Sequence, residues 1–197
     1  MQNSSNKIES IAVYCSSSDV IHKEYFQVAA ELGKAMADNG MQLIYGGGMV
    51  GLMGEVAKNV KKYKGKTCGV VPKALNIENV VNDIDDELII TDGMRERKAV
   101  MDDKADAFIG LPGGFGTFEE MFEVLTLKQL AYHNKPIIFL NIRGFYNKLF
   151  EMFEHIYAES FAKEQYRTLY HISENVSEAI KYMEEYKAPE LPDKWFV

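Results

Sequence analysis

The stretch Leu111-Pro112-Gly113-Gly114-Phe115-Gly116-Thr117-Phe118-Glu119-Glu120 leads from an apolar strand directly into a helix. Its glycines let backbone N–H groups approach an anion without a Cβ in the way. A helix that begins near Thr117 aims the positive end of its dipole at the same point. The stretch therefore predicts a phosphate-binding turn between a strand and a helix, the building unit of a parallel α/β sheet.

Outward from this turn, short apolar runs alternate with amphipathic segments along the chain. Strands are expected at 10–15, 41–45, 67–71, 88–91, 107–111, 136–141 and 169–172. Helices are expected at 22–39, 50–63, 94–105, 118–132, 145–159 and 176–185. Because this alternation is typical of a sheet covered on both faces, we predict a Rossmann-like, doubly wound α/β fold with a mainly parallel sheet.

Three helix ends carry recognisable signals. Gly40 follows the first helix as a C′ glycine, and Asp92 precedes the helix that begins at Met94. Asn175 and Glu178 form a capping-box-like start for the last helix.

Length and composition indicate one soluble domain. The chain has 197 residues, of which 47% are hydrophobic and 26% charged. We expect the domain to span residues 10–190, with a disordered leader at 1–9 and a tail at 191–197. The polar start lacks a secretory signal, so we expect a cytoplasmic protein.

The charge and the apolar pattern disfavour two classes of partner. A formal net charge of −7 repels an extended phosphate backbone, so no nucleic-acid partner is expected. No apolar run approaches the ~20 residues of a membrane span, so no membrane partner is expected either.

The cysteines and histidines do not predict a metal site. Cys15 and Cys68 fall in or at the end of expected strands and are interpreted as buried free thiols. The four histidines are scattered and lack the spacing of metal ligands. We therefore predict neither a metal nor another cofactor.

A second glycine-rich turn is Tyr45-Gly46-Gly47-Gly48-Met49-Val50-Gly51-Leu52-Met53-Gly54. It follows an expected strand, as do the serines at 16–18 and the turn after Leu111. Ligands of open α/β sheets bind at the carboxyl ends of the strands, so one crevice collects these segments. For the glycines at 46–48, phosphate contact and a purely structural turn remain equal alternatives. Neither turn has the G-x-x-x-x-G-K-[ST] pattern of a triphosphate-binding loop.

The helix at 94–105 places two cations among apolar residues. Met94, Arg97, Lys98 and Met101 recur at helical spacing and share one stripe. One interpretation is that the cations extend to water or pair with acids such as Glu119, Glu120 or Glu123. We favour an anionic or electron-rich ligand, because unpaired cations on an inward stripe are costly.

Two residues of the following helix have structural and functional interpretations. Thr117-Phe118-Glu119-Glu120 fits a capping box in which Glu120 bonds back to the helix start. A carboxylate beside a phosphate turn also suits catalysis, and the residues alone do not separate the two roles. Thr126 contacts a substrate or hydrogen-bonds back to a helix carbonyl.

These segments together resemble the LONELY GUY (LOG) family, the phosphoribohydrolases that activate cytokinins. The matches are P-G-G-x-G-T-x-x-E from Pro112, M-x-x-R-K-A-x-M from Met94 and Y-G-G-G-x-x-G-L-M-G from Tyr45. The resemblance runs from about Ile11 to Asn141. One departure is Ser16, which stands where the family usually has the glycine of C-G-S-S.

The resemblance implies hydrolysis of the N-glycosidic bond of purine nucleoside 5′-monophosphates, carrying adenine or N6-prenyladenine, to the free base and ribose 5-phosphate. It marks Arg97 and Glu120 as catalytic. Its substrate-binding residues are Ser17, Gly47, Gly48, Glu78, Met94, Lys98, Gly113, Gly114, Phe115, Gly116, Thr117, Phe118, Glu119 and Thr126, with Glu78 placed by loose analogy. It also implies a homodimer, which agrees with a surplus of apolar residues on the helices expected at 118–132 and 145–159.

A different class of function is a non-catalytic nucleotide carrier or sensor on the same fold, which needs the phosphate turns but neither Arg97 nor Glu120. A dehydrogenase is disfavoured, because no G-x-G-x-x-G follows the first strand. Relatives have been labelled lysine decarboxylases, but no convincing lysine for pyridoxal phosphate is visible.

Overall fold

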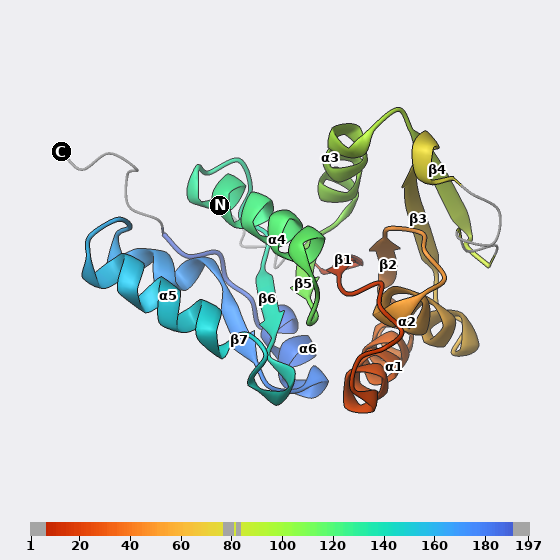
Figure 1. The fold of residues 1–197 in the computed structure, drawn as a ribbon, viewed down its shortest axis with the longest axis horizontal. Helices are drawn as coiled ribbons and strands as arrows, with labels where there is room; N and C mark the ends of the chain where they lie inside the picture. The colour runs from red at the N-terminus through yellow and green to blue at the C-terminus, as the bar shows by residue number, and fades with distance from the viewer. Residues whose placement is uncertain (1–6, 77–80, 82–83, 191–197) are drawn as a thin grey trace.

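The computed structural model describes residues 7–76, 81 and 84–190. Its seven strands form one all-parallel sheet in the order β4-β3-β2-β1-β5-β6-β7 (Figure 1). The strands are β1 (Ser10–Tyr14), β2 (Gln42–Tyr45), β3 (Thr67–Pro72), β4 (Glu87–Thr91), β5 (Ala107–Gly110), β6 (Ile137–Leu140) and β7 (His171–Ser173). The predicted fold class and all seven strands are confirmed.

Helices cover both faces of the sheet. They are α1 (Lys23–Asp38), α2 (Gly51–Lys62), α3 (Met94–Lys104), α4 (Phe115–Gln129), α5 (Asn147–Ala158) and α6 (Val176–Glu184), with short 3₁₀ turns at Lys73–Leu75, Ile142–Gly144 and Glu164–Leu169. Side chains of α1, α2 and α6 pack on one face, and α3, α4 and α5 cover the other. None of the helices in the described part of the chain is long and apolar enough to cross a membrane.

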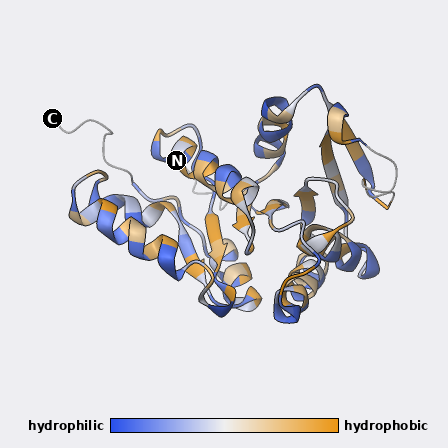
Figure 2. Cartoon of the chain, in the orientation of Figure 1, coloured by the Kyte–Doolittle hydropathy of each residue, from blue (hydrophilic) through white to orange (hydrophobic). Residues whose placement is uncertain are grey.

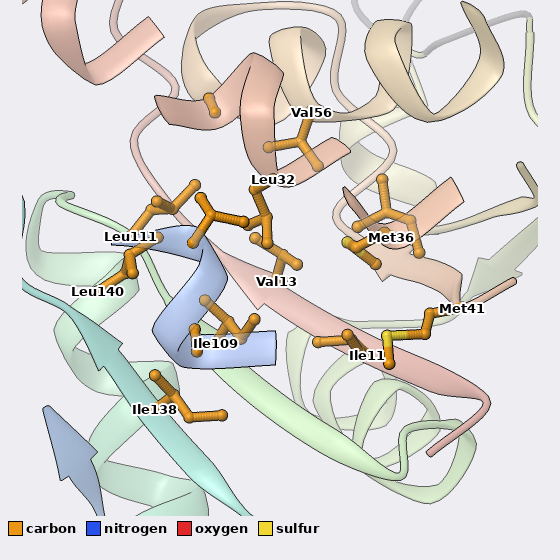
Figure 3. Close-up of a cluster of buried hydrophobic side chains, with 14 of the residues drawn as sticks. Ile11, Val13, Leu32, Met36, Met41, Val56, Ile109, Leu111, Ile138 and Leu140 are labelled. Carbon is orange, nitrogen blue, oxygen red and sulfur yellow. The ribbon is translucent and has the colours of Figure 1, made fainter. Parts of the chain in front are cut away.

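Successive side chains of β1 point to opposite faces of the sheet, so this strand contributes to the hydrophobic core on each face. Ile11 and Val13 face the α1 side, where they join Leu32, Met36 and Ile109 (Figure 3). Ala12 and Tyr14 face the opposite core, beneath α3 and α4. Hydrophobic colour marks an interior strand such as β6 along its length, whereas α3 is predominantly hydrophilic (Figure 2). A polar helix on a buried sheet is therefore held by few apolar contacts, among them Met101.

Aromatic side chains anchor α5. Phe153 and Tyr157 are buried and pack with Tyr166 and Leu169 in a third cluster.

Several helix ends differ from the sequence prediction. Helix α4 begins at Phe115 with Gly114 as its N-cap, three residues before the predicted start at 118. Helix α5 begins at Asn147 rather than 145, because Arg143 and Gly144 adopt positive φ values in the preceding turn. Helix α3 has Gly93, not Asp92, as its N-cap.

Two predicted helix signals are confirmed. Gly40 has φ +68° after α1, and the Glu178 N–H donates to Asn175 Oδ1 at 2.9 Å. Of the expected termini, residues 1–6 of the leader and the whole tail at 191–197 lie outside the described residues.

Strand order reverses at β1. The chain runs from β1 outward to β4 on one side and returns to β5 on the other. The carboxyl ends of β1 and β5 are thus the switch point at which open α/β sheets bind ligands.

Candidate functional site

Backbone hydrogen bonds join the two strand ends at the switch point. The Leu111 N–H donates to Tyr14 O at 2.9 Å, and the Ser16 N–H donates to Pro112 O at 3.2 Å. The Tyr146 hydroxyl, which is buried, donates to Leu111 O at 2.6 Å. The start of the glycine-rich turn is therefore held by three bonds.

The N-terminus of α4 is open for an anion. Gly114 caps the helix without a side-chain bond, and none of the described residues accepts a hydrogen bond from the N–H groups of Phe115, Gly116 or Thr117. A Cβ on Gly116 would meet nothing within 4 Å. Three unpaired N–H groups at a helix start, with free space before them, suit a phosphate.

Packing against Thr117 explains why residue 113 is a glycine. A Cβ there would lie 2.0 Å from the Thr117 hydroxyl oxygen, which packs over the turn. Thr117 is buried within the first turn of α4 and is not its cap.

The N-terminus of α2 is occupied by the protein itself. The Gly51 N–H donates to Asp19 Oδ1 at 2.8 Å, and the Leu52 N–H donates to Ser16 O at 2.9 Å. Sequence reasoning missed this role of Asp19, which a carboxylate shortly after a strand end could have suggested. An anion therefore meets fewer free donors here than at α4.

Packing accounts for the glycines before α2. A Cβ on Gly46 would lie 2.3 Å from Arg97 Nη2, and one on Gly47, which has φ +70°, would lie 2.4 Å from Val71 Cγ2. A Cβ on Gly48 would lie 2.8 Å from Met53 Cε. These contacts favour the structural alternative for the turn, and substrate contact by Gly47 and Gly48 stays a prediction.

A buried ion pair joins α3 to α4. Arg97 Nη1 donates to Glu120 Oε1 at 2.9 Å, and Arg97 Nε donates to Val70 O at 3.0 Å. Both charged side chains are 11% exposed. Arg97 and Glu120 are therefore brought together in one site, as the sequence predicted.

The premise of unpaired cations was wrong. Arg97 is paired with Glu120, and Lys98 is paired with Glu119 and, at 2.6 Å, with Glu123. Their partners lie on α4, which sequence spacing within α3 does not reveal.

The capping-box interpretation of Glu120 is also wrong. With α4 starting at Phe115, Thr117 is the third helical residue, and the Glu120 carboxylate bonds to Arg97 instead of the helix start. Burial raises the pKa of Glu120, and the Arg97 guanidinium opposes that rise without cancelling it. A partly desolvated carboxylate of raised pKa beside an anion cradle is suited to proton transfer.

The other predicted site residues lie around this centre. Met94 is half exposed at the start of α3, Phe115 is 96% exposed, and Phe118 is half-buried against Phe145. Thr126 Oγ1 donates to Phe122 O at 2.7 Å, which is the back-bond predicted as its alternative. Ser17 lies in the turn after β1, and Glu78 lies outside the described residues.

A shallow hollow of about 360 Å³ runs along α4 beside the Lys98 pairs. It is lined by Glu119, Phe122, Glu123, Thr126 and Leu127. Within the described ranges, no group of three histidine, cysteine or carboxylate side chains is placed to hold a metal ion.

Comparisons with known proteins show the family to which the chain belongs. The family model described as "Possible lysine decarboxylase" matches residues 53–183. A cytokinin riboside 5′-monophosphate phosphoribohydrolase of Arabidopsis thaliana is 36% identical over 193 residues, covering 98% of this chain and 88% of that protein. One from Oryza sativa subsp. japonica is 39% identical over 181 residues, covering 92% and 75%.

Among solved structures, the molybdenum cofactor carrier protein of Chlamydomonas reinhardtii superposes with a TM-score of 0.69 at 24% identity, covering 91% of this chain and 97% of that one. At this identity the likeness shows the shared fold.

Proposed function

The chain belongs to the family described as possible lysine decarboxylase, which includes the LOG phosphoribohydrolases, and from that membership we propose that it is a hydrolase of nucleoside 5′-monophosphates. Its products are the free base and ribose 5-phosphate. The substrate carries adenine or N6-prenyladenine, in keeping with the cytokinin riboside monophosphates named for the relatives.

The observation that carries the proposal is the buried Arg97–Glu120 pair beside the open start of α4. The open N–H groups of Phe115, Gly116 and Thr117 bind the 5′-phosphate, which supplies binding energy away from the reacting carbon. The ribose then lies against the pair, so that the reacting carbon is held near Glu120.

The reaction separates charge in a way that Glu120 can stabilise. The bond from C1′ to the base nitrogen breaks with its electron pair leaving on the base, and positive charge develops on the ribose. The Glu120 carboxylate stabilises that charge and takes a proton from the attacking water, whose oxygen bonds to C1′. The leaving nitrogen takes up a proton, and Glu120 returns its own to solvent.

Arg97 sets the state of Glu120 before substrate arrives. Its guanidinium keeps the buried carboxylate closer to its ionised form than burial alone would allow. The bond from Arg97 Nε to Val70 O fixes the guanidinium on the sheet, so the carboxylate is held at a constant position.

A carrier on the same fold is the second candidate. A carrier would use the α4 cradle but would need neither Arg97 nor Glu120, so the buried pair of these residues favours the hydrolase. Incubation with AMP, isopentenyladenosine monophosphate, adenosine and ATP, followed by assay of free base, tests the proposal. We expect turnover of monophosphates only. Tight binding of monophosphates without release of base would establish the carrier instead.

A further inference from the structure

Tyr14 ends strand β1 with a hydroxyl buried beneath the site. Its ring is 3% exposed and stacks on Phe108 with the centroids 6.4 Å apart. Its hydroxyl donates to Asp102 Oδ1 at 2.9 Å. Tyr14 therefore links the central strand of the sheet to helix α3.

Asp102 is a largely buried acid, and burial disfavours its charged form. It faces Tyr14 from β1, Lys98 on its own helix, Glu123 from α4 and Lys135 from the turn before β6. Burial raises its pKa to about 6, with repulsion from Glu123 adding to the rise, while the Tyr14 bond, Lys135 and Lys98 oppose it. Lys135 Nζ also donates to the backbone carbonyl of Asp102 at 2.5 Å. The end of α3 is thereby held from two sides.

The charges of Arg97 and Glu120 also act on the Tyr14 hydroxyl. The charges of Asp102 and Glu120 add to burial in raising the pKa of Tyr14, and the Arg97 charge lowers it. Arg97 precedes Asp102 by five residues on α3, so any shift of this helix on the sheet moves the guanidinium against Glu120.

Helix α3 has few other means of keeping its place. Of its eleven residues, Arg97 and Met101 are the buried ones. Arg97 Nε donates to Val70 O, and Val100 packs partly on the core, but the other contacts of the helix include ion pairs to half-exposed acids, such as Lys98 with Glu119 and Glu123, which give little positional restraint. A buried hydrogen bond to a carboxylate is stronger and directional.

We propose that Tyr14 and Asp102 are a proton-linked pair of positioning residues, whose hydrogen bond fixes α3 on strand β1 and holds Arg97 in line with Glu120. The proposal rests on the hydrolase function for its catalytic consequence. When Asp102 is ionised the bond is charge-assisted and the helix is held. When Asp102 takes up a proton the bond weakens, and the alignment of Arg97 with Glu120 loosens.

The test compares Tyr14→Phe, Asp102→Ala and Asp102→Asn with the matched control Asp103→Asn, which makes the same change at the exposed neighbouring position. We expect Tyr14→Phe and Asp102→Ala to lower kcat for AMP about tenfold at pH 8 with KM unchanged, because each loses one hydrogen bond to a charged group. The double variant should be no worse than either single variant.

Asp102→Asn separates positioning from charge. Asparagine still accepts from the Tyr14 hydroxyl but carries no charge, so it imitates protonated Asp102 at every pH. We expect its kcat at pH 8 to lie between the native value and that of Asp102→Ala, and the part of the fall of kcat through about pH 6 that is due to Asp102 to disappear. A merely structural pair would instead lower the melting temperature of Tyr14→Phe and Asp102→Ala and leave kcat at the native value. That result overturns the proposal.

Carboxyl ¹³C NMR titration of Glu120 gives a readout that needs no substrate. Asp102→Asn and Tyr14→Phe should raise the titration midpoint of Glu120, because a less well aligned Arg97 opposes the effect of burial less, and Asp103→Asn should leave the midpoint in place. If the native protein hydrolyses no nucleotide, the proposed function fails, and this titration still decides the inference. An unchanged Glu120 midpoint in both Asp102→Asn and Tyr14→Phe would refute the coupling.

Discussion

At the scale of single residues, the position of a helix start decides what Glu120 does. Had α4 begun after Thr117, the carboxylate would have been used by the helix backbone. Because the helix begins at Phe115, the backbone N–H groups stay open and the carboxylate is left for Arg97. The earlier start of α4 therefore has two effects at once: it leaves the backbone N–H groups unpaired, and it leaves the Glu120 carboxylate free to pair with Arg97.

Glu120→Gln tests the chemistry of this carboxylate. Glutamine keeps an oxygen that can accept from Arg97 but can neither carry charge nor take a proton. We expect hydrolysis of AMP to fall by roughly 10²-fold to 10⁴-fold, the usual contribution of a positioned acid or base. Single-turnover release of adenine measures the rate, and calorimetry should give native AMP affinity. Glu123→Gln, at a partly exposed position of the same helix that also pairs with Lys98, is the control and should remain active. A native rate for Glu120→Gln would remove Glu120 from the mechanism.

At the scale of elements, the two ends of α4 are built for different purposes. Its start leaves donors unpaired, whereas its last turn buries Lys128, whose side chain is fully enclosed. Unpaired N–H groups and a buried lysine both lower stability. A substitution at either end of α4 should therefore change the stability of the protein in a measurable way.

Gly116→Ala should change stability and binding in opposite directions. Alanine stabilises a helix by up to about 1 kcal/mol over glycine, and a Cβ at 116 meets no protein atom within 4 Å. The melting temperature should therefore rise. The same Cβ obstructs an anion at the helix start, so KM for AMP should increase while adenosine binding stays unchanged. If KM for AMP stays native in the more stable variant, the phosphate does not bind at this turn.

Lys128→Met should stabilise the protein at neutral pH. Lys128 Nζ has no hydrogen-bond partner in the described part of the chain and lies 5.1 Å from the centroid of the Tyr186 ring. Burial lowers its pKa to about 8 from the usual 10.5, so between these values the unfolded state holds a proton that the folded state has lost. The native free energy of unfolding should therefore rise as the pH increases from about 8 to 10.5.

In Lys128→Met this rise should disappear, and the variant should be more stable at pH 7 by roughly 1–3 kcal/mol. Urea unfolding at several pH values measures both effects. Lys148→Met, at an exposed position of α5, should retain the native pH dependence. A destabilised Lys128→Met at pH 7 would show that the buried charge has a compensating partner.

At the scale of the whole molecule, the sequence predicted the layers better than the contacts between them. Alternating apolar runs were enough for the parallel sheet, because each strand with its helix is a local pattern. Pairing of the α3 cations with Glu119, Glu120 or Glu123 was only one of two interpretations, since which acid meets which cation depends on how α3 and α4 lie across a sheet whose strand order the sequence does not state. The failed capping box has a physical reason as well. A capping box is predicted on the assumption that the first N–H groups of a helix are hydrogen-bonded within the protein, whereas an anion-binding site needs these groups unpaired.

The outer face of α4 and α5 carries exposed apolar side chains, and we propose that two copies of the chain associate there. Phe122 is 40% exposed and packs edge-on against Phe153 of α5, and Met152 is 54% exposed. Phe122→Glu should shift a dimer to a monomer in size-exclusion chromatography with light scattering. Tyr63→Glu, at a residue 39% exposed after α2, is the matched control and should stay dimeric. A native protein that is monomeric at high concentration would refute the proposed association.

The central place of β1 has a consequence for biosynthesis. The ribosome delivers β1 first, and β2, β3 and β4 can add to one of its edges in the order in which they emerge. The other edge stays bare until residues 107–110 of β5 have left the exit tunnel. Until then the nascent chain has an unpaired apolar strand edge to which other chains can add. The arrival of β5 covers that edge of β1 and brings the two strand ends of the switch point together, so the central strand is protected by the same step that begins to assemble the site, whereas the outer edge of β5 is covered only by β6.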